Sequence, residues 1–313
     1  MPKNTKIKFS ARLYAEIIHK QYNVLCDKNR ILWIYDPPAG LWSYNGEAKV
    51  DKELREKFLH DNHLSNFHVR EVISDLKALA FKDREFPEPE DCIIPFNNGV
   101  YNLKSAEFVE FKSEYHLKSK LAIDYNPDNK GCPLIEKIFQ GLVTPEFLMD
   151  LYELSAYCLI PTYKIQEWFI LLGSGRNGKS VYCSIIAMLL GKHNVSSVSL
   201  HQLQSRPFFS AELHGKFANI RAESQSSDLN TTDLLKMLTG GDLILAEKKH
   251  QQPFKFVNHA KLIFSANELP RTKDKTLSFY RRVRIIPFPY TFEGRMRTNL
   301  FWIGSVKMNW RDL

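Results

Sequence analysis

The sequence lacks the features that would anchor it in a membrane or cross-link it. Its five cysteines lie far apart, which excludes a paired zinc-ligand motif and argues against a disulfide framework. The apolar runs at 168–172 and 185–190 are too short to span a bilayer, and the first residues carry no apolar signal segment. No internal repeat or low-complexity stretch is visible. These absences predict a globular protein of the reducing cytoplasm with no membrane partner.

Length and charge indicate a medium-sized basic protein. The 313 residues are enough for a sizeable core and favour two domains over one. Lysine and arginine number 43 against 35 acidic residues, which gives a net charge of +8. A basic balance favours polyanion partners such as nucleic acid, although an ordinary basic protein has the same composition.

Residues 1–163 mix helical and strand patterns. Leu13, Ile17 and Ile18 recur at helical spacing, and Asn97-Asn98-Gly99 predicts a tight turn because asparagine and glycine tolerate positive φ. The helical segments expected are 10–22, 53–80 and 133–159, and the strands expected are 31–35, 41–44, 92–96 and 100–103. We therefore expect residues 1–163 to form a mixed accessory domain that is helical toward its end.

The pattern changes after Tyr163. Strand and helix patterns alternate from there on, which is typical of a three-layer α/β domain. The sequence predicts that residues 164–313 form this domain, with a parallel sheet between helices.

A glycine-rich segment joins the strand pattern at 167–172 to the helix pattern at 181–190. It matches the phosphate-loop pattern GxxxxGK[ST] with the following residues: Gly173, Ser174, Gly175, Arg176, Asn177, Gly178, Lys179 and Ser180. The glycines permit positive φ and a close backbone approach, so N–H groups at the helix start can surround a phosphate. We expect Lys179 to contact the β- and γ-phosphates of ATP and Ser180 to bind Mg²⁺. The alternative is a plain glycine-rich turn.

Three later segments carry residues that would complete a hydrolytic site. Glu223 follows a strand pattern and is the candidate to orient the attacking water and to contact Mg²⁺. Asn267 follows the next buried strand, where an amide can hold the γ-phosphate or the water. Arg281 and Arg282 precede the last strand and are candidates for an arginine finger acting on a neighbouring subunit. Taken singly, each of these residues could equally be an ordinary surface group.

Residues 243–256 form two strand-like arms around a basic tip. The tip contains Lys248, Lys249 and His250, which suit contacts to the phosphates of DNA. A solvated basic loop is the alternative.

The order of these segments is more specific than any one of them. GSGRNGKS, NIRAES, LLKMLTGGDLILAEKKHQQPFKF, KLIFSANELP and RRVRIIPF follow one another, after IPFNNGVYNL, NPDNKGCP and LYELSAYCLIP. This succession resembles the superfamily III helicase domain of phage and plasmid primase-helicases, which also occurs in large DNA viruses. The resemblance covers about residues 31–288.

The resemblance implies an AAA+-like ATPase with an N-terminal helicase-associated domain. It implies that Glu223 is the Walker B acid, Asn267 is sensor 1, Arg281 or Arg282 is the finger, and the 248–250 tip lines a central channel. The family acts as hexameric rings that hydrolyse ATP between subunits and move along single-stranded or forked DNA, with a primase or polymerase as candidate partners.

The sequence departs from the family pattern in three ways. Ala222 stands where many Walker B motifs have a second acid, no primase motif is visible, and the chain ends soon after the finger. Two alternatives therefore stay open: a DNA-binding module that melts an origin without processive unwinding, and a P-loop kinase of a small substrate.

Overall fold

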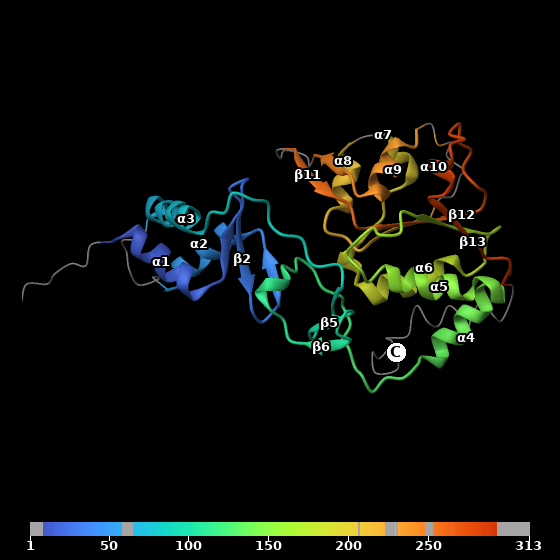
Figure 1. The fold of residues 1–313 in the computed structure, drawn as a ribbon, viewed down its shortest axis with the longest axis horizontal. Helices are drawn as coiled ribbons and strands as arrows, with labels where there is room; N and C mark the ends of the chain where they lie inside the picture. The colour runs from blue at the N-terminus through green and yellow to red at the C-terminus, as the bar shows by residue number, and fades with distance from the viewer. Residues whose placement is uncertain are drawn as a thin grey trace, which may run out of the picture. The chain divides into compact units, whose positions relative to one another are not determined.

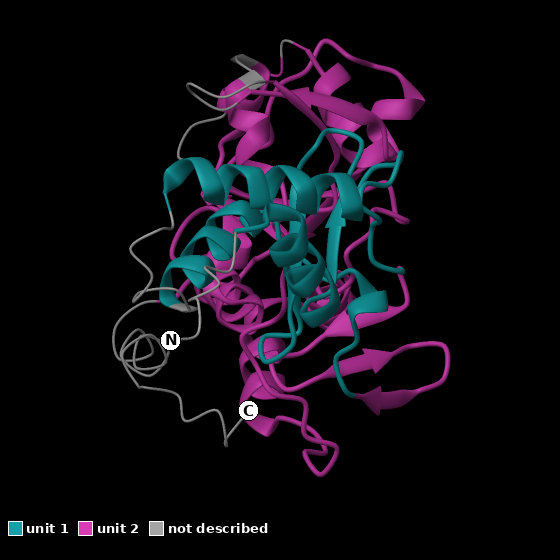
Figure 2. Cartoon of the chain, turned by 90° about the vertical axis from the view of Figure 1, so that its left-hand side faces the viewer, with its two compact units in different colours: residues 1–90, 110–118 teal, residues 91–109, 119–313 magenta. Residues whose placement is uncertain are grey.

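The structure is a computed structural model that describes residues 9–57, 65–205, 207–222, 229, 231–247 and 253–292. The chain divides into two compact units (Figure 2). Unit 1 comprises residues 1–90 and 110–118, and unit 2 comprises residues 91–109 and 119–313. This division differs from the single boundary expected near residue 163, because the helices that precede the glycine-rich loop pack in unit 2. No helix among the described residues is long and apolar enough to cross a membrane.

Unit 1 packs helices on a small antiparallel sheet. Its elements are α1 (Ala11–Gln21), β1 (Val24–Cys26), β2 (Leu32–Asp36), β3 (Leu41–Ser43), α2 (Gly46–Lys57), α3 (Asn66–Ala80) and a 3₁₀ turn η1 (Ser113–Tyr115). The strand order is β1-β2-β3. Ser10 begins α1 by accepting a hydrogen bond from the backbone N–H of Leu13. The face of α1 that packs into the core is carried by Ala15 and Ile18, whereas Leu13 and Ile17 are about half exposed, so the predicted helix is confirmed but its predicted apolar face is wrong in part.

Unit 2 begins with a second antiparallel sheet and a pair of helices. The order β4-β5-β6 joins Ile93–Pro95, Val100–Asn102 and Glu107–Val109, so the turn predicted at Asn97-Asn98-Gly99 does connect two paired strands. The expected helical stretch at 133–159 is two helices, α4 (Pro133–Leu142) and α5 (Pro145–Tyr157). Pro145 explains the break, because proline fits the first turn of a helix but not its interior.

A five-stranded parallel sheet forms the centre of unit 2. Its order is β13-β7-β12-β9-β8. The strands are β7 (Trp168–Leu172), β8 (Val195–Ser196), β9 (Ala218–Ala222), β12 (Lys261–Ala266) and β13 (Val283–Pro287). The helical elements that follow them are α6 (Lys179–Leu190), η2 (Lys192–Asn194), α7 (Leu200–Ser205), α8 (Pro207–Ser210), η3 (Ala211–Leu213), α9 (Asp233–Gly240) and α10 (Leu277–Tyr280). The predicted α/β fold with a parallel sheet is confirmed.

Helices cover both faces of this sheet (Figure 1). Alternate residues of β7 point in opposite directions, as the period of a strand requires. Phe169 and Leu171 pack with α4, α5 and α6, while Trp168 and Ile170 pack with α7, α9 and α10. The sheet is therefore buried on both sides, which fixes the direction in which each strand end points.

A buried lysine ties the chain after α5 to the start of β12. Lys261 has no exposed surface, and its Nζ donates to the carbonyls of Thr162 at 2.7 Å, His259 at 3.0 Å and Ile160. The ammonium also lies 4.5 Å from the ring centre of Tyr157. Burial lowers the pKa of Lys261 to about 7.

Candidate functional site

The glycine-rich loop joins β7 to α6 as the sequence predicts. Gly175 and Gly178 have φ of 113° and 80°, and Arg176 also adopts a positive φ of 52°. Gly178 directly precedes α6 and has no capping side chain, so the first N–H groups of the helix are not satisfied by one. Such a helix start attracts anions because its free N–H groups and its dipole both favour negative charge.

Lys179 points back across this loop. Its Nζ donates to the carbonyl of Gly173 at 2.6 Å and lies 3.2 Å from Asn177 Oδ1 and 3.5 Å from Asn267 Oδ1. The residue is only 7% exposed, and burial lowers the pKa of its ammonium. Within the described residues no carboxylate pairs with it. A buried ammonium that has only neutral oxygens around it is electrostatically incomplete, and a phosphate would compensate it.

Asn177 and Gly173 shape the loop rather than face solvent. Asn177 is 2% exposed, accepts from the N–H of Gly175, and donates from Nδ2 to the carbonyl of Tyr290 at 2.9 Å. Gly173 does not have a positive φ, so of the two reasons expected for the glycines only close backbone approach applies to it. A Cβ there would lie 2.6 Å from the carbonyl oxygen of Phe288, so the position requires glycine for close approach.

Replacing Gly173 by alanine should therefore destabilise unit 2. The added Cβ meets a backbone atom that cannot rotate away, and we expect a loss of about 1–3 kcal/mol in the free energy of unfolding. Gly141→Ala is the matched control, because a Cβ at Gly141 meets nothing within 4 Å and alanine favours the helix by up to about 1 kcal/mol. Urea unfolding measures both, and equal stability of the two variants would contradict the packing argument.

The polar strand ends predicted to complete the site lie at the same edge of the sheet. β7 and β12 are neighbours in the sheet. The chain crosses from β7 to β8 on one side of this pair and from β12 to β13 on the other side. Such a switch point forms a crevice at the carboxyl ends of parallel strands. Asn267 follows β12 there and reaches Lys179, as expected for a shared site. Ser180 is exposed in the first turn of α6, and Glu223, which directly follows β9, lies outside the described residues.

The two arginines lie at the opposite ends of the strands, beside the amino end of β7. Arg282 precedes β13, whose first residue pairs with Trp168 at the start of β7. A five-residue strand of about 16 Å therefore separates the arginines from the glycine-rich loop that follows β7. Arg282 is half-buried and donates from Nη1 to the carbonyl of Ser278 at 2.7 Å. Arg281 is exposed, and its contact to Gln166 Oε1 is longer, at 3.4 Å.

The expected basic hairpin has its two arms in the described part of the chain. β10 (Leu243–Ala246) and β11 (Phe254–Val257) pair antiparallel, with Leu243 opposite Val257. The predicted hairpin is therefore confirmed in its arms. Its tip, with Lys248, Lys249 and His250, lies outside the described residues.

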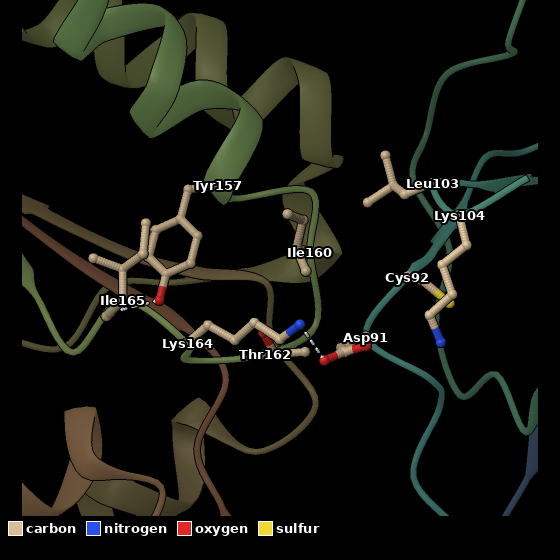
Figure 3. Close-up of a pocket in the computed structure, with 9 residues that line it drawn as sticks. All are labelled: Asp91, Cys92, Leu103, Lys104, Tyr157, Ile160, Thr162, Lys164 and Ile165. Carbon is tan, nitrogen blue, oxygen red and sulfur yellow. Dashed lines mark hydrogen bonds and ion pairs between the residues drawn. The ribbon is translucent and has the colours of Figure 1, made fainter. Parts of the chain in front are cut away.

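A pocket lies near the amino end of β7, away from the glycine-rich loop. It has a volume of about 360 Å³, and nine of its lining residues are drawn in Figure 3. Its charged side chains include Lys164 and Asp91, which pair with each other at 2.5 Å. Because this lysine is already paired with a carboxylate, the pocket is less suited to an anion than the loop around Lys179.

A parallel sheet with this loop between an inner strand, β7, and the next helix, α6, has a P-loop NTPase-like fold. Two family profiles match the chain in succession: "D5 N terminal like" over residues 12–144, and a family of unknown function, DUF5906, over residues 171–282. Solved structures of the NrS-1 C-terminal region in apo form align with TM-scores of 0.57 and 0.56, each 14% identical. The alignments cover 96% and 97% of this chain and 70% and 72% of the NrS-1 chains. At this identity the likeness shows the fold alone.

The curated relatives are viral proteins. The chain is 29% identical to the "Putative helicase L207/L206" of Acanthamoeba polyphaga mimivirus over 88% of its length, and 25% identical to the "Putative helicase 121R" of Invertebrate iridescent virus 3 over 75%. It is 24% identical to the "Putative primase C962R" of African swine fever virus over 60%. It spans only 30%, 27% and 21% of these three proteins. Together these matches support the resemblance to phage and viral primase-helicases.

Proposed function

We propose that this chain is an ATPase that moves along DNA and unwinds it. The observation that carries the proposal is the buried Lys179 ammonium, held in a glycine-rich loop at the sheet's switch point with neutral oxygens as its described partners. The names of the viral relatives favour a helicase over a small-molecule kinase as the use of that site.

The start of α6 and the ends of the neighbouring strands have separate roles in the proposed hydrolysis. The N–H groups at the start of α6 hold the β-phosphate, and Lys179 draws the β- and γ-oxygens toward the sheet. Asn267 and Glu223 orient the attacking water. Ser180, exposed in the first turn of α6, fits Mg²⁺, which keeps several waters and needs few protein ligands. The ion would supply charge neutralisation at the phosphates.

The finger must act on another copy of the chain. Arg281 and Arg282 stand at the sheet edge opposite their own Lys179, so neither completes the site of its own subunit. A head-to-tail ring brings this edge against a neighbour's loop, and we propose a homo-hexamer. Arg281 is the better candidate, because Arg282 is held by the carbonyl of Ser278.

The β10–β11 hairpin is the proposed DNA contact. Its tip residues Lys248, Lys249 and His250 would grip single-stranded or forked DNA in the ring channel. The chain would work in the cytoplasm, with a primase or polymerase as its partner at the fork.

One experiment separates this proposal from its rivals. ATP hydrolysis is measured with and without single-stranded DNA, together with the mass of the assembly and strand displacement. Stimulation with displacement supports a helicase, and stimulation without displacement supports an origin-melting module. Hydrolysis or phosphate transfer that ignores DNA would support a P-loop kinase and overturn the proposal.

Changing both tip lysines should weaken DNA binding and lower its salt dependence. Each lost phosphate contact flattens the slope of log K against log salt by roughly 0.7 on single strands, so Lys248→Ala with Lys249→Ala should flatten it by about 1.4. Basal ATP hydrolysis should largely persist, because the tip is separate from the phosphate loop in the chain. The matched control is Lys49→Ala with Lys52→Ala in α2. If the double variant binds DNA with the wild-type slope of log K against log salt, the tip lysines do not contact the DNA phosphates.

A further inference from the structure

A carboxylate in the segment after β12 holds the beginning of α9. Asp274 Oδ2 lies 2.6 Å from Lys236 Nζ and accepts a hydrogen bond from Thr232 Oγ1. Its Oδ1 accepts from the N–H of Thr276 at 2.9 Å and from Thr276 Oγ1 at 2.6 Å. These donors, the Lys236 ammonium first among them, lower the pKa of the Asp274 carboxyl. We call Asp274, Lys236 and Thr232 the Asp274 clasp.

The clasp differs from an ordinary surface ion pair. The Asp274 and Lys236 side chains are only 13% and 25% exposed, and the carboxylate has hydrogen bonds at both oxygens. Exposed ion pairs contribute little to stability because water and salt screen them. A partly buried carboxylate that is hydrogen-bonded at both oxygens keeps a fixed geometry. The two segments are also joined at a second point, where the N–H of Leu229 donates to the carbonyl of Arg271 at 2.7 Å.

Through Thr232 and Lys236, the clasp is joined to α9, the helix that precedes the hairpin. Thr232 is the residue before α9, and Lys236 lies one turn into it. α9 ends at Gly240, and Gly241, with φ of 82°, and Asp242 connect it to β10. Asn258, the residue after β11, is 1% exposed and donates to the carbonyl of Leu238 in α9 at 2.9 Å. Helix and hairpin base are therefore connected at both ends of the hairpin.

Through Asp274, the clasp is joined to the segment that contacts the phosphate loop. Asp274 belongs to the segment that begins at Asn267, the residue within 3.5 Å of the Lys179 ammonium. A shift of Asn267 when the γ-phosphate arrives or leaves would move this segment, and the clasp would carry that movement to the start of α9.

We propose that the Asp274 clasp couples the nucleotide state sensed at Asn267 to the β10–β11 hairpin. Asp274 and Lys236 are then positioning residues, which touch neither ATP nor DNA. The inference rests on the proposed function, because it needs nucleotide at Lys179 and a working hairpin. A purely structural clasp would instead support folding alone.

The test removes the ion pair while preserving shape. Asp274→Asn keeps the side-chain volume and one of the two acceptor oxygens but removes the negative charge, and Lys236→Met removes the ammonium. Lys275→Met is the matched control, because Lys275 is an exposed lysine of the same segment outside the clasp. The measurements are affinity for a non-hydrolysable ATP analogue, hydrogen exchange in α9, β10 and β11 with and without it, and ATP hydrolysis with and without single-stranded DNA.

In the wild type, the analogue should slow hydrogen exchange in α9 and the hairpin arms. In both clasp variants we expect nucleotide affinity and basal hydrolysis to persist. The analogue's effect on the arms should disappear, and DNA stimulation should fall about fivefold or more. A merely structural role would lower thermal stability and both rates together, and leave the ratio of stimulated to basal rate unchanged.

Several results would overturn the proposal. Clasp variants with wild-type stimulation and wild-type exchange would show that the clasp transmits nothing. A wild-type protein that binds the analogue without any change of hydrogen exchange in α9 would also show that the clasp transmits nothing. A wild-type protein that binds no nucleotide would instead remove the proposed function itself, so the two failures are distinguishable.

Discussion

Lys179→Met should abolish ATP turnover while leaving the protein folded. The substitution removes the charge that lies among Gly173 O, Asn177 Oδ1 and Asn267 Oδ1 and replaces it with an apolar chain of similar length. Removing a single preorganised transition-state contact lowers the rate by about 10²–10³-fold, and a phosphate-loop lysine also contributes to binding. We therefore expect a loss of at least this size, measured as phosphate release at saturating ATP.

Thermal unfolding separates this effect from misfolding. The apo variant should be at least as stable as the wild type, because burial lowers the pKa of Lys179 and the charged form is disfavoured in the fold. Nucleotide at 100 times its Kd should stabilise the wild type by about 2.7 kcal/mol but not the variant. Lys192→Met, an exposed lysine just after α6, is the control and should behave as wild type. A folded Lys179→Met protein with normal turnover would remove the phosphate-loop assignment.

A mixture of two inactive variants should regain ATP hydrolysis. Arg281→Ala alone should lower turnover by about 10³-fold or more, the range in which fingers supplied in trans act. Mixed with Lys179→Met, an Arg281→Ala subunit supplies an intact phosphate loop and its neighbour supplies an intact arginine. With random mixing of equal amounts, about one quarter of head-to-tail interfaces should be complete.

Arg282→Ala gives the comparison for that experiment. Because Arg282 is held by the carbonyl of Ser278, we expect its loss to lower thermal stability while some turnover remains. The opposite result, with rescue from Arg282→Ala and none from Arg281→Ala, would assign the finger to Arg282. If mixed rings form and neither mixture is rescued, no finger acts between subunits.

The sequence predicted the order of strands and helices in unit 2 well. Short apolar runs that end at glycine or at a polar residue are strong signals, and β7, α6, β12 and β13 lie within two residues of their expected positions. The glycine-rich pattern also predicted the loop around Lys179. These features depend on neighbours in the sequence, and local patterns record such neighbours directly.

Contacts between distant residues could not be predicted in this way. Leu13 and Ile17 have helical spacing, yet which face of α1 is buried depends on α3, with which it packs. The reason for Gly173 is the carbonyl of Phe288, more than a hundred residues later. The choice between Arg281 and Arg282 depends on burial, and the Lys236–Asp274 pair has no spacing signal. The roles of Glu223 and of the hairpin tip stay predictions.

The interrupted course of the chain through its two units limits how it can be shortened. Residues 91–109 belong to unit 2 although residues 110–118 return to unit 1. Within unit 2, Ile94 joins the core beside α4 and α5, the N–H of Leu121 donates to the carbonyl of Pro95, and that of Asn97 to the carbonyl of Ile123. A fragment that starts at residue 119 would leave that core open and those backbone groups unpaired. Recombinant fragments and gene fusions should therefore retain residue 91 onward, because no single cut between the units yields two intact pieces.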